Sequence, residues 1–323
     1  MIKYSIVVPM YNEELVAEVC HRRLTEALSG LEESYELIYV NDGSRDRTEA
    51  ILEGLREGDA HVRLIHFSRN FGHQAAVSAG MRYSSGQAVV VIDADLQDPP
   101  EVIPEMIAKW KAGYDVVYGK RTRRMGESFF KKITAKLFYR ILASMTNVEI
   151  PVDAGDFRLL DRKVCDVMNG LTEKNPYLRG LVSWVGFKQT YVEFIREERF
   201  AGETKYPLKK MIKFAIDGIT AFSMGPLKMA ANLGFCMSGL SFLYLIWALV
   251  QRTVGQVVAG WASMVALMLF FDGVILILLG VMGEYVGRIY DECKNRPLFI
   301  VAETKGFGEH AASARPGENI EDE

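Results

Sequence analysis

The chain has 323 residues and a formal net charge of −3, which argues against a dedicated nucleic-acid-binding protein. Its four cysteines are scattered and form no closely spaced pair, so they predict neither a disulfide framework nor a zinc site and fit a reducing compartment. Apolar residues are unevenly distributed: residues 1–205 have the composition of a soluble domain, whereas residues 229–283 have that of membrane-embedded segments.

Short apolar runs alternate with helical patterns through the first 119 residues. We predict strands at 4–9, 35–40, 62–67, 88–93 and 115–119, and helices near 13–29, 46–57, 72–84 and 100–112. Strands that alternate with helices in this way indicate βαβ units and a mostly parallel sheet, which places the chain in the α/β class. The strands are apolar throughout rather than alternately apolar and polar, as expected where helices cover both faces of the sheet.

Two later segments combine apolar residues at helical spacing with a basic face. In 127–145 the basic residues recur every four positions, and in 207–223 Lys209, Lys210 and Lys213 lie opposite an apolar stripe. A basic amphipathic helix can lie on an anionic membrane surface, although an ordinary helix with a solvated lysine face has the same pattern.

Residues 229–250 and about 257–282 are each long and apolar enough to cross a bilayer. The short loop between them carries one arginine, whereas the flanking segments are rich in lysine and arginine. The positive-inside rule therefore places both ends in the cytoplasm, and no signal peptide precedes the first strand. We expect a catalytic domain at 1–205, an amphipathic juxtamembrane helix at 206–228, a transmembrane hairpin at 229–283, a cytoplasmic segment at 284–308 and a disordered tail at 309–323.

Polar clusters follow three of the predicted strands: PMYNEE (9–14), VNDGSRDRT (40–48) and DADLQDPP (93–100). Each alone is compatible with turn formation, because Asn, Asp, Gly and Pro are ordinary turn residues. The carboxyl ends of parallel strands meet at one sheet edge, where nucleotides bind in open α/β folds, so the three clusters together favour a ligand site. The paired carboxylates of Asp93 and Asp95 suit a hard cation such as Mg²⁺ or Mn²⁺.

These clusters, with RNFGHQAAVSAG (69–80) and DAGDFRLLDR (153–162), resemble family 2 glycosyltransferases with the GT-A fold. Within that family the chain is similar to the polyprenyl-phosphate sugar transferases, namely dolichol-phosphate mannose synthases and bactoprenol glucosyltransferases. The resemblance extends over RFAGETKYPLKKM (199–211), the two predicted spans and GEYVGRIYDECKNRP (283–297), and so covers nearly the whole chain to about residue 300. It implies a Rossmann-like GT-A domain followed by membrane-surface helices and a two-helix transmembrane hairpin.

The resemblance also implies roles for particular residues. Asp156 falls where the family has its catalytic carboxylate. Mg²⁺ or Mn²⁺ on the donor diphosphate would be held by Asp95 and Asp93, helped by Gln97. Phosphate ligands would be Arg121, Lys205 and Arg158, although an ion pair within the GDFR turn is an equally good role for Arg158. The nucleotide would contact Pro9, Tyr11, Glu13, Asp42, Asp93 and Ala94.

By this resemblance the chain would transfer a sugar, with inversion, from a nucleotide sugar to polyprenyl (undecaprenyl) phosphate at the cytoplasmic face of the inner membrane. UDP-glucose is the favoured donor, because DAGDFRLLDR and the two-span hairpin are most similar to bactoprenol glucosyltransferases. UDP-N-acetylglucosamine, another UDP-sugar and GDP-mannose stay open as alternatives. Similar proteins imply a homotetramer, and a flippase would take the lipid-linked product for cell-envelope glycosylation.

Two other functional classes share part of the pattern. A processive polysaccharide synthase would have the same sheet and paired aspartates, but the QxxRW signature usual in that class is missing from the nearest stretch, YLRGLVSWVG (177–186). A membrane-anchored scaffold that binds nucleotide sugars without turnover is disfavoured by the intact carboxylates at Asp93, Asp95 and Asp156.

Overall fold

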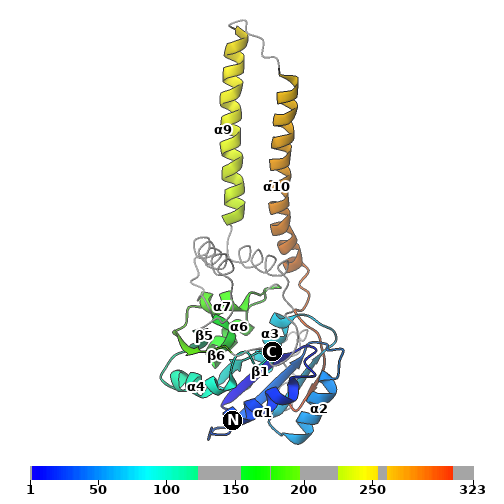
Figure 1. The fold of residues 1–323 in the computed structure, drawn as a ribbon, viewed down its shortest axis with the longest axis vertical. Helices are drawn as coiled ribbons and strands as arrows, with labels where there is room; N and C mark the ends of the chain where they lie inside the picture. Colours follow the sequence, from blue (N-terminus) through cyan, green and yellow to red (C-terminus); the bar gives the residue numbers. More distant parts are fainter. Residues whose placement is uncertain (1, 123–153, 175, 197–224, 254–259, 308–323) are drawn as a thin grey trace, which may run out of the picture.

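A computed structural model describes residues 2–122, 154–174, 176–196, 225–253 and 260–307. Figure 1 shows a layered α/β domain from which two long helices, α9 (Gly225–Thr253) and α10 (Trp261–Cys293), rise side by side. The basic segment 127–145, most of the juxtamembrane segment 206–228 and the tail 309–323 lie outside the described residues.

One sheet of eight strands forms the centre of the domain, in the order β7-β5-β6-β4-β1-β2-β3-β8. Four of the seven strand pairings are parallel, which confirms the mostly parallel sheet. The strands are β1 (Tyr4–Met10), β2 (Tyr35–Asn41), β3 (Val62–Phe67), β4 (Ala88–Val91), β5 (Val116–Arg121), β6 (Ala154–Asp161), β7 (Gln189–Phe194) and β8 (Val301–Lys305). Because β4 ends at Val91, Asp93 lies in the loop after the strand rather than on the strand itself.

Helices cover both faces of this sheet, which explains the continuously apolar strands. On one face, Ile6 and Tyr39 belong to a core with residues of α1 (Ala17–Leu28), α2 (Thr48–Gly58) and α4 (Ile103–Lys111), which follows a short 3₁₀ turn, η1 (Pro100–Val102). On the other face, Val7 and Ile38 belong to a core with residues of α3 (His73–Tyr83), α6 (Arg162–Asn169) and α7 (Leu178–Trp184). Neighbouring strand residues therefore face opposite cores, as the pleat requires.

Three strands were not predicted from the sequence: β6, β7 and β8. Strand β6 lies antiparallel between β4 and β5 and contains Asp156 and Arg158. The segment after residue 284 was expected only as a cytoplasmic helix or segment. Its first part is helical, as the continuation of α10 to Cys293, and its last part forms the unexpected strand β8, which pairs antiparallel with β3. Phe299, just before β8, is buried and stacks on Phe67 with ring centroids 5.2 Å apart.

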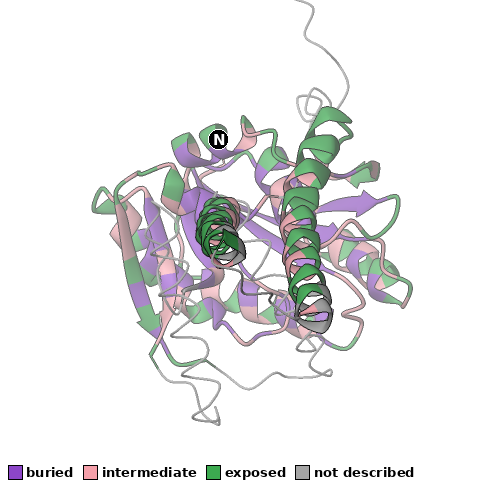
Figure 2. Ribbon diagram, turned by 90° about the horizontal axis from the view of Figure 1, so that it is seen from above, coloured by how far each residue is buried: buried purple, intermediate pink, exposed green. Residues whose placement is uncertain are grey.

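The predicted spans 229–250 and 257–282 fall largely on α9 and α10, although α10 extends beyond the second predicted boundary. By length and composition, one stretch among the described residues, Phe270–Cys293, can cross a membrane. Seen from above in Figure 2, both helices are mostly exposed, and their exposed side chains include Phe235, Leu276 and Ile277. Exposed large apolar side chains on this scale are typical of a surface that contacts a membrane or another protein.

Candidate active site

The loops after β1 and β2 are joined to each other at the carboxyl edge of the sheet. The backbone N–H of Asn12 donates to Ser44 Oγ (3.0 Å), and the Asn12 side-chain oxygen accepts from the N–H of Arg45 (2.8 Å). Asn12 has a left-handed backbone, with φ at 52°, which turns the chain sharply after β1. Among the predicted nucleotide contacts on this edge, Tyr11 and Glu13 are partly exposed, whereas Pro9 is buried within β1.

Asp42 joins the second loop to the segment that starts α3. Its two carboxylate oxygens accept hydrogen bonds from the N–H groups of Phe71 (2.6 Å) and Gly72 (3.0 Å). Burial raises the pKa of Asp42, and the two backbone donors oppose that rise. Asp42 therefore fixes the turn that leads into His73, and a contact between Asp42 and the nucleotide base stays a prediction.

Four charged side chains from three separate elements meet beyond this turn. Asp156 Oδ1, on β6, accepts a hydrogen bond from Arg179 Nη2 of α7 (3.3 Å) and lies 3.6 Å from Arg158 Nη2. Asp156 Oδ2 lies 3.5 Å from His73 Nε2, at the start of α3. The same His73 nitrogen lies 3.5 Å from Asp93 Oδ1, so the histidine stands between the two predicted functional carboxylates. We call Asp156, Arg158, Arg179 and His73 the charged cluster.

The cluster strongly favours the ionised form of Asp156. Burial alone would raise the pKa of Asp156, but His73, Arg179 and Arg158 together hold it well below its usual range. Burial would lower the pKa of His73, but the surrounding carboxylates, with Asp93 the largest contributor, raise it to about 9. Burial lowers the pKa of Arg158 to about 10, which leaves it charged at neutral pH. A carboxylate held in this way is a weak proton acceptor.

The paired aspartates follow β4 in a tight loop. Asp93 Oδ1 is enclosed and has no hydrogen-bond partner within the described residues, and burial raises the pKa of Asp93 to about 6 against the effect of His73. Asp95 Oδ1 accepts a hydrogen bond from the N–H of Gln97 (3.1 Å). Across the described ranges, no group of three or more His, Cys, Asp or Glu side chains is arranged to hold a metal ion. Two carboxylates fit a divalent cation whose other oxygen ligands come from a bound diphosphate.

The predicted phosphate ligands have different surroundings. Arg121 Nη2 pairs with both oxygens of the buried Asp98, at 3.1 and 3.2 Å, next to the aspartate loop. Gln97 accepts a hydrogen bond from Arg196 through its side-chain oxygen. Arg158 forms the expected ion pair with Asp156, but both residues lie on β6 rather than in a turn. Ala94 is buried, and Lys205 lies outside the described residues.

Sequence reasoning missed His73 and Arg179 as members of the site. His73 lies in RNFGHQAAVSAG (69–80) and Arg179 in YLRGLVSWVG (177–186). For His73 the signal that was present is a titratable residue at the start of the predicted helix 72–84, whereas no helix was predicted around Arg179. What identifies the two residues is their shared contact with Asp156, which joins positions far apart in the chain.

Comparisons with known proteins agree with this architecture. The model of glycosyl transferase family 2 matches residues 5–168, and the GtrB C-terminal hairpin model matches residues 217–289. The chain is 59% identical over 307 residues to the "Uncharacterized glycosyltransferase YkcC" of Bacillus subtilis (strain 168), with 95% of each chain covered. It is 42% identical over 300 residues to the SfII prophage-derived bactoprenol glucosyl transferase of Shigella flexneri, covering 93% of this chain and 97% of that one.

Among solved structures, glucosyl-3-phosphoglycerate synthase from Mycobacterium tuberculosis in complex with UDP matches with a TM-score of 0.43 and 20% identity. The match covers 68% of this chain and 79% of that one. At this level of likeness the match carries no functional argument.

Proposed function

Because the chain belongs to glycosyl transferase family 2, we propose that it transfers glucose from UDP-glucose to undecaprenyl phosphate at the cytoplasmic face of a membrane. The observation that carries the proposal is the arrangement Asp93–His73–Asp156, which sets a carboxylate suited to a metal beside a cluster of cations. Relatives named bactoprenol glucosyl transferase at about 40% identity over most of the chain support the choice of sugar and acceptor.

The donor side of the reaction is assigned to the strand-end loops. Asp93 and Asp95, helped by Gln97, would hold Mg²⁺ or Mn²⁺, which offsets the negative charge of the departing diphosphate. The remaining donor contacts, proposed from the resemblance, are Pro9, Tyr11, Glu13, Asp42 and Ala94 for the nucleotide, and Arg121 and Lys205 for its phosphates.

The acceptor side is assigned to the charged cluster. An oxygen of the lipid phosphate attacks the anomeric carbon from the face opposite the leaving diphosphate, and the bond to the nucleotide breaks with inversion. Arg158, Arg179 and His73 supply positive charge for the acceptor phosphate, and Asp156 fixes their positions. Preorganised charge of this kind needs no rearrangement when the transition state forms.

A polyprenyl acceptor requires the site to face a membrane, because its chain stays in the bilayer while its phosphate reacts. The match of residues 217–289 to a GtrB C-terminal hairpin and the apolar stretch Phe270–Cys293 support α9 and α10 as the anchor. We propose an inner-membrane protein with two spans and with both termini in the cytoplasm. From the resemblance we also propose a homotetramer, which light scattering of the detergent-solubilised protein would test, and a flippase that takes the product.

The donor and acceptor are tested together with purified full-length protein, undecaprenyl phosphate and Mn²⁺. We expect a glucosylated lipid with UDP-glucose and little or no product with UDP-N-acetylglucosamine or GDP-mannose, measured by mass spectrometry of the extracted lipid. A different sugar on the lipid would overturn the donor assignment. A polymeric product would favour the processive synthase, and a protein that binds UDP-glucose but neither hydrolyses nor transfers it would favour the scaffold.

The orientation in the membrane gives a separate prediction. In a background without the exposed Cys236 and Cys293, a cysteine placed at Gly255 should react with an impermeant thiol reagent added to intact cells. A cysteine placed beside Lys305 should react only after permeabilisation, because the flanking segments carry the positive charge. The reverse labelling pattern would place the catalytic domain outside and contradict the proposal.

A further inference from the structure

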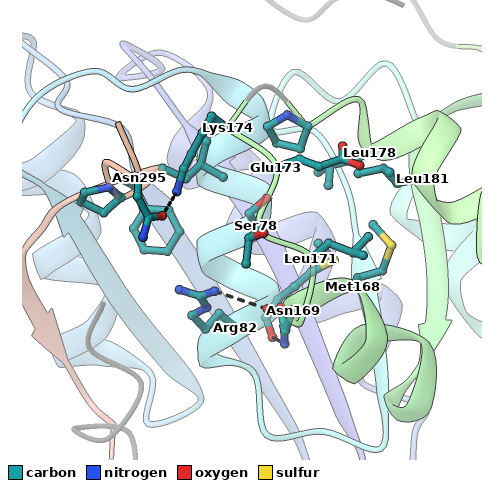
Figure 3. Close-up of a pocket in the computed structure, with 16 residues that line it drawn as sticks. Ser78, Arg82, Met168, Asn169, Leu171, Glu173, Lys174, Leu178, Leu181 and Asn295 are labelled. Carbon is teal, nitrogen blue, oxygen red and sulfur yellow. Dashed lines mark hydrogen bonds between the residues drawn. The ribbon is translucent and has the colours of Figure 1, made fainter. Parts of the chain in front are cut away.

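A cavity of about 370 Å³ lies on the α3, α6 and α7 side of the domain. At about 30 Å³ per molecule this volume corresponds to roughly twelve waters, far more than a single ion requires. Figure 3 shows its lining, which comes from α3, the end of α6, the connection into α7 and the segment that follows α10. No residue of this cavity has a role in the proposed transfer.

The cavity combines apolar walls with two cations. Arg82 Nη2 donates a long hydrogen bond to the carbonyl of Asn169 (3.4 Å), and Lys174 Nζ donates to Asn295 Oδ1 (2.8 Å). Both of these partners are neutral, and neither cation has a carboxylate within 4.0 Å in the described part of the chain. Glu173 also lines the cavity, so its three charged residues sum to +1. The apolar residues of the lining are Met81, Met168, Leu171, Pro176, Leu178, Leu181, Pro297, Leu298 and Phe299.

The cavity lies next to the carboxyl-terminal end of α10. The backbone N–H of Lys174 donates to Glu292 Oε1 (2.8 Å), and Asn295 lies two residues after the end of the helix. Glu292 belongs to Phe270–Cys293, the stretch that can cross a membrane. In Figure 1, α10 descends onto the part of the domain that carries α3, which places the cavity where the anchor leaves the proposed bilayer.

We propose that this cavity binds the headgroup region of an anionic phospholipid from the surrounding bilayer. Arg82 and Lys174 provide the positive charge for the headgroup, and the apolar walls accommodate the glycerol and the first methylenes of the chains. A free phosphate ion would leave the apolar walls without a partner. Basic pockets beside transmembrane helices bind anionic headgroups through the same combination of charge and position.

The bound lipid is expected to support the active site through α7. Met81 and Leu178 line this cavity and also a small second one, whose lining includes Asp156 and Arg158. Leu178 directly precedes Arg179, the residue that hydrogen-bonds to Asp156. A lipid packed against Leu178 would therefore hold the first turn of α7 and keep Arg179 in place. This consequence for activity rests on the proposed function, whereas lipid binding does not.

The test measures binding of dioleoyl phosphatidylglycerol to the detergent-solubilised full-length protein by native mass spectrometry. Arg82→Gln combined with Lys174→Gln should weaken binding about 30-fold, as expected for two lost cation–anion contacts near a membrane surface. The matched control, Arg22→Gln combined with Lys188→Gln, removes two exposed cations elsewhere and should bind like the unmodified protein. Equal binding by the two double variants would overturn the proposal.

A second variant separates the cavity from general surface charge. Ser78 lies on the wall formed by α3, and Ser78→Trp fills the cavity while keeping both cations. This variant should also lose phosphatidylglycerol, and an unchanged thermal unfolding temperature in each variant shows that the domain is folded. Retention of the lipid by a folded Ser78→Trp protein would overturn the cavity as the site.

Displacement of bound phosphatidylglycerol by other ligands tests which molecule occupies the cavity. Phosphatidylcholine and inorganic phosphate at the same concentration should not displace phosphatidylglycerol, and displacement by either would overturn the assignment to an anionic lipid. Displacement by undecaprenyl phosphate would assign the cavity to the acceptor and contradict a bulk phospholipid. Because the readout is binding, a protein that failed to transfer glucose would still give each of these results.

Discussion

Replacing Asp95 with alanine should abolish sugar transfer, and EDTA should do the same in the unmodified protein. Asp95 and Asp93 follow β4 at the carboxyl edge of the sheet, and no other carboxylates complete a metal site there within the described residues. A cation held by this pair would contribute several kcal/mol of charge stabilisation to the transition state. Its loss should therefore lower the rate by about 10³-fold or more. The measurement is the initial rate of lipid glucosylation, with and without added Mn²⁺.

The control for this prediction is Asp166→Ala, which removes an exposed carboxylate from α6. It should transfer glucose at the normal rate and respond to EDTA as the unmodified protein does. Asp95→Ala should keep the normal unfolding temperature, because Asp95 lies in a partly exposed loop. Full activity in thoroughly chelated protein would show that transfer does not use a metal, and the paired aspartates would then need another role.

Asp156→Asn should keep measurable activity that rises with pH between about 5 and 7, as the lipid phosphate ionises, and then levels off. The acceptor is a phosphate monoester whose second pKa is about 6, by analogy with phosphorylated side chains, so it is already mostly dianionic at neutral pH. Removing its proton therefore contributes little to the rate. The pKa of Asp156 is also held low by His73, Arg179 and Arg158, so Asp156 is ionised throughout this range but accepts protons poorly. We expect its main role to be the positioning of those cations.

The measurement for Asp156 is the pH profile of the asparagine variant at saturating substrates. An obligatory general base would cost 10²–10⁴-fold, with no recovery at high pH. A positioning role predicts a smaller loss, recovery as the lipid phosphate ionises, and a KM for undecaprenyl phosphate that rises more than the KM for UDP-glucose. Arg179→Gln should show the same split in KM, because it removes one of the positioned cations. An Asp156→Asn protein that is inactive at every pH, yet binds lipid phosphate normally, would establish Asp156 as the base.

The strands that the sequence predicted are those whose residues are buried on both faces. In β1 and β2 nearly every position is buried, so a continuous apolar run marks each strand. In β6, Phe157 and Leu159 face one core, while Asp156 and Arg158, between and beside them, serve the charged cluster. The charges interrupt the apolar run, and the strand could not be distinguished from a polar loop.

The sequence predicted that the polar strand-end clusters lie together, but it did not predict the contacts within the charged cluster. Residues that follow strand ends lie at one edge whatever the details of packing, so the grouping of the polar clusters could be predicted from chain order alone. His73, Asp156 and Arg179 meet because α3 and α7 pack on the same face of the sheet next to β6, which depends on the three-dimensional arrangement of those elements. The short β8 could be recognised only once its pairing with β3 was visible.

The position of β8 constrains how the domain moves relative to its anchor. Seven residues, 294–300, connect the end of α10 to β8, a length that spans at most about 25 Å when fully extended. The burial of Phe299 and the contacts of Lys174 with Glu292 and Asn295 shorten that reach further. In the proposed membrane arrangement, an anchor joined to an edge strand of the catalytic sheet would hold the reaction centre at a nearly constant height above the bilayer. The lipid acceptor then searches in two dimensions, and its effective concentration is set by membrane composition rather than by its amount in the cell.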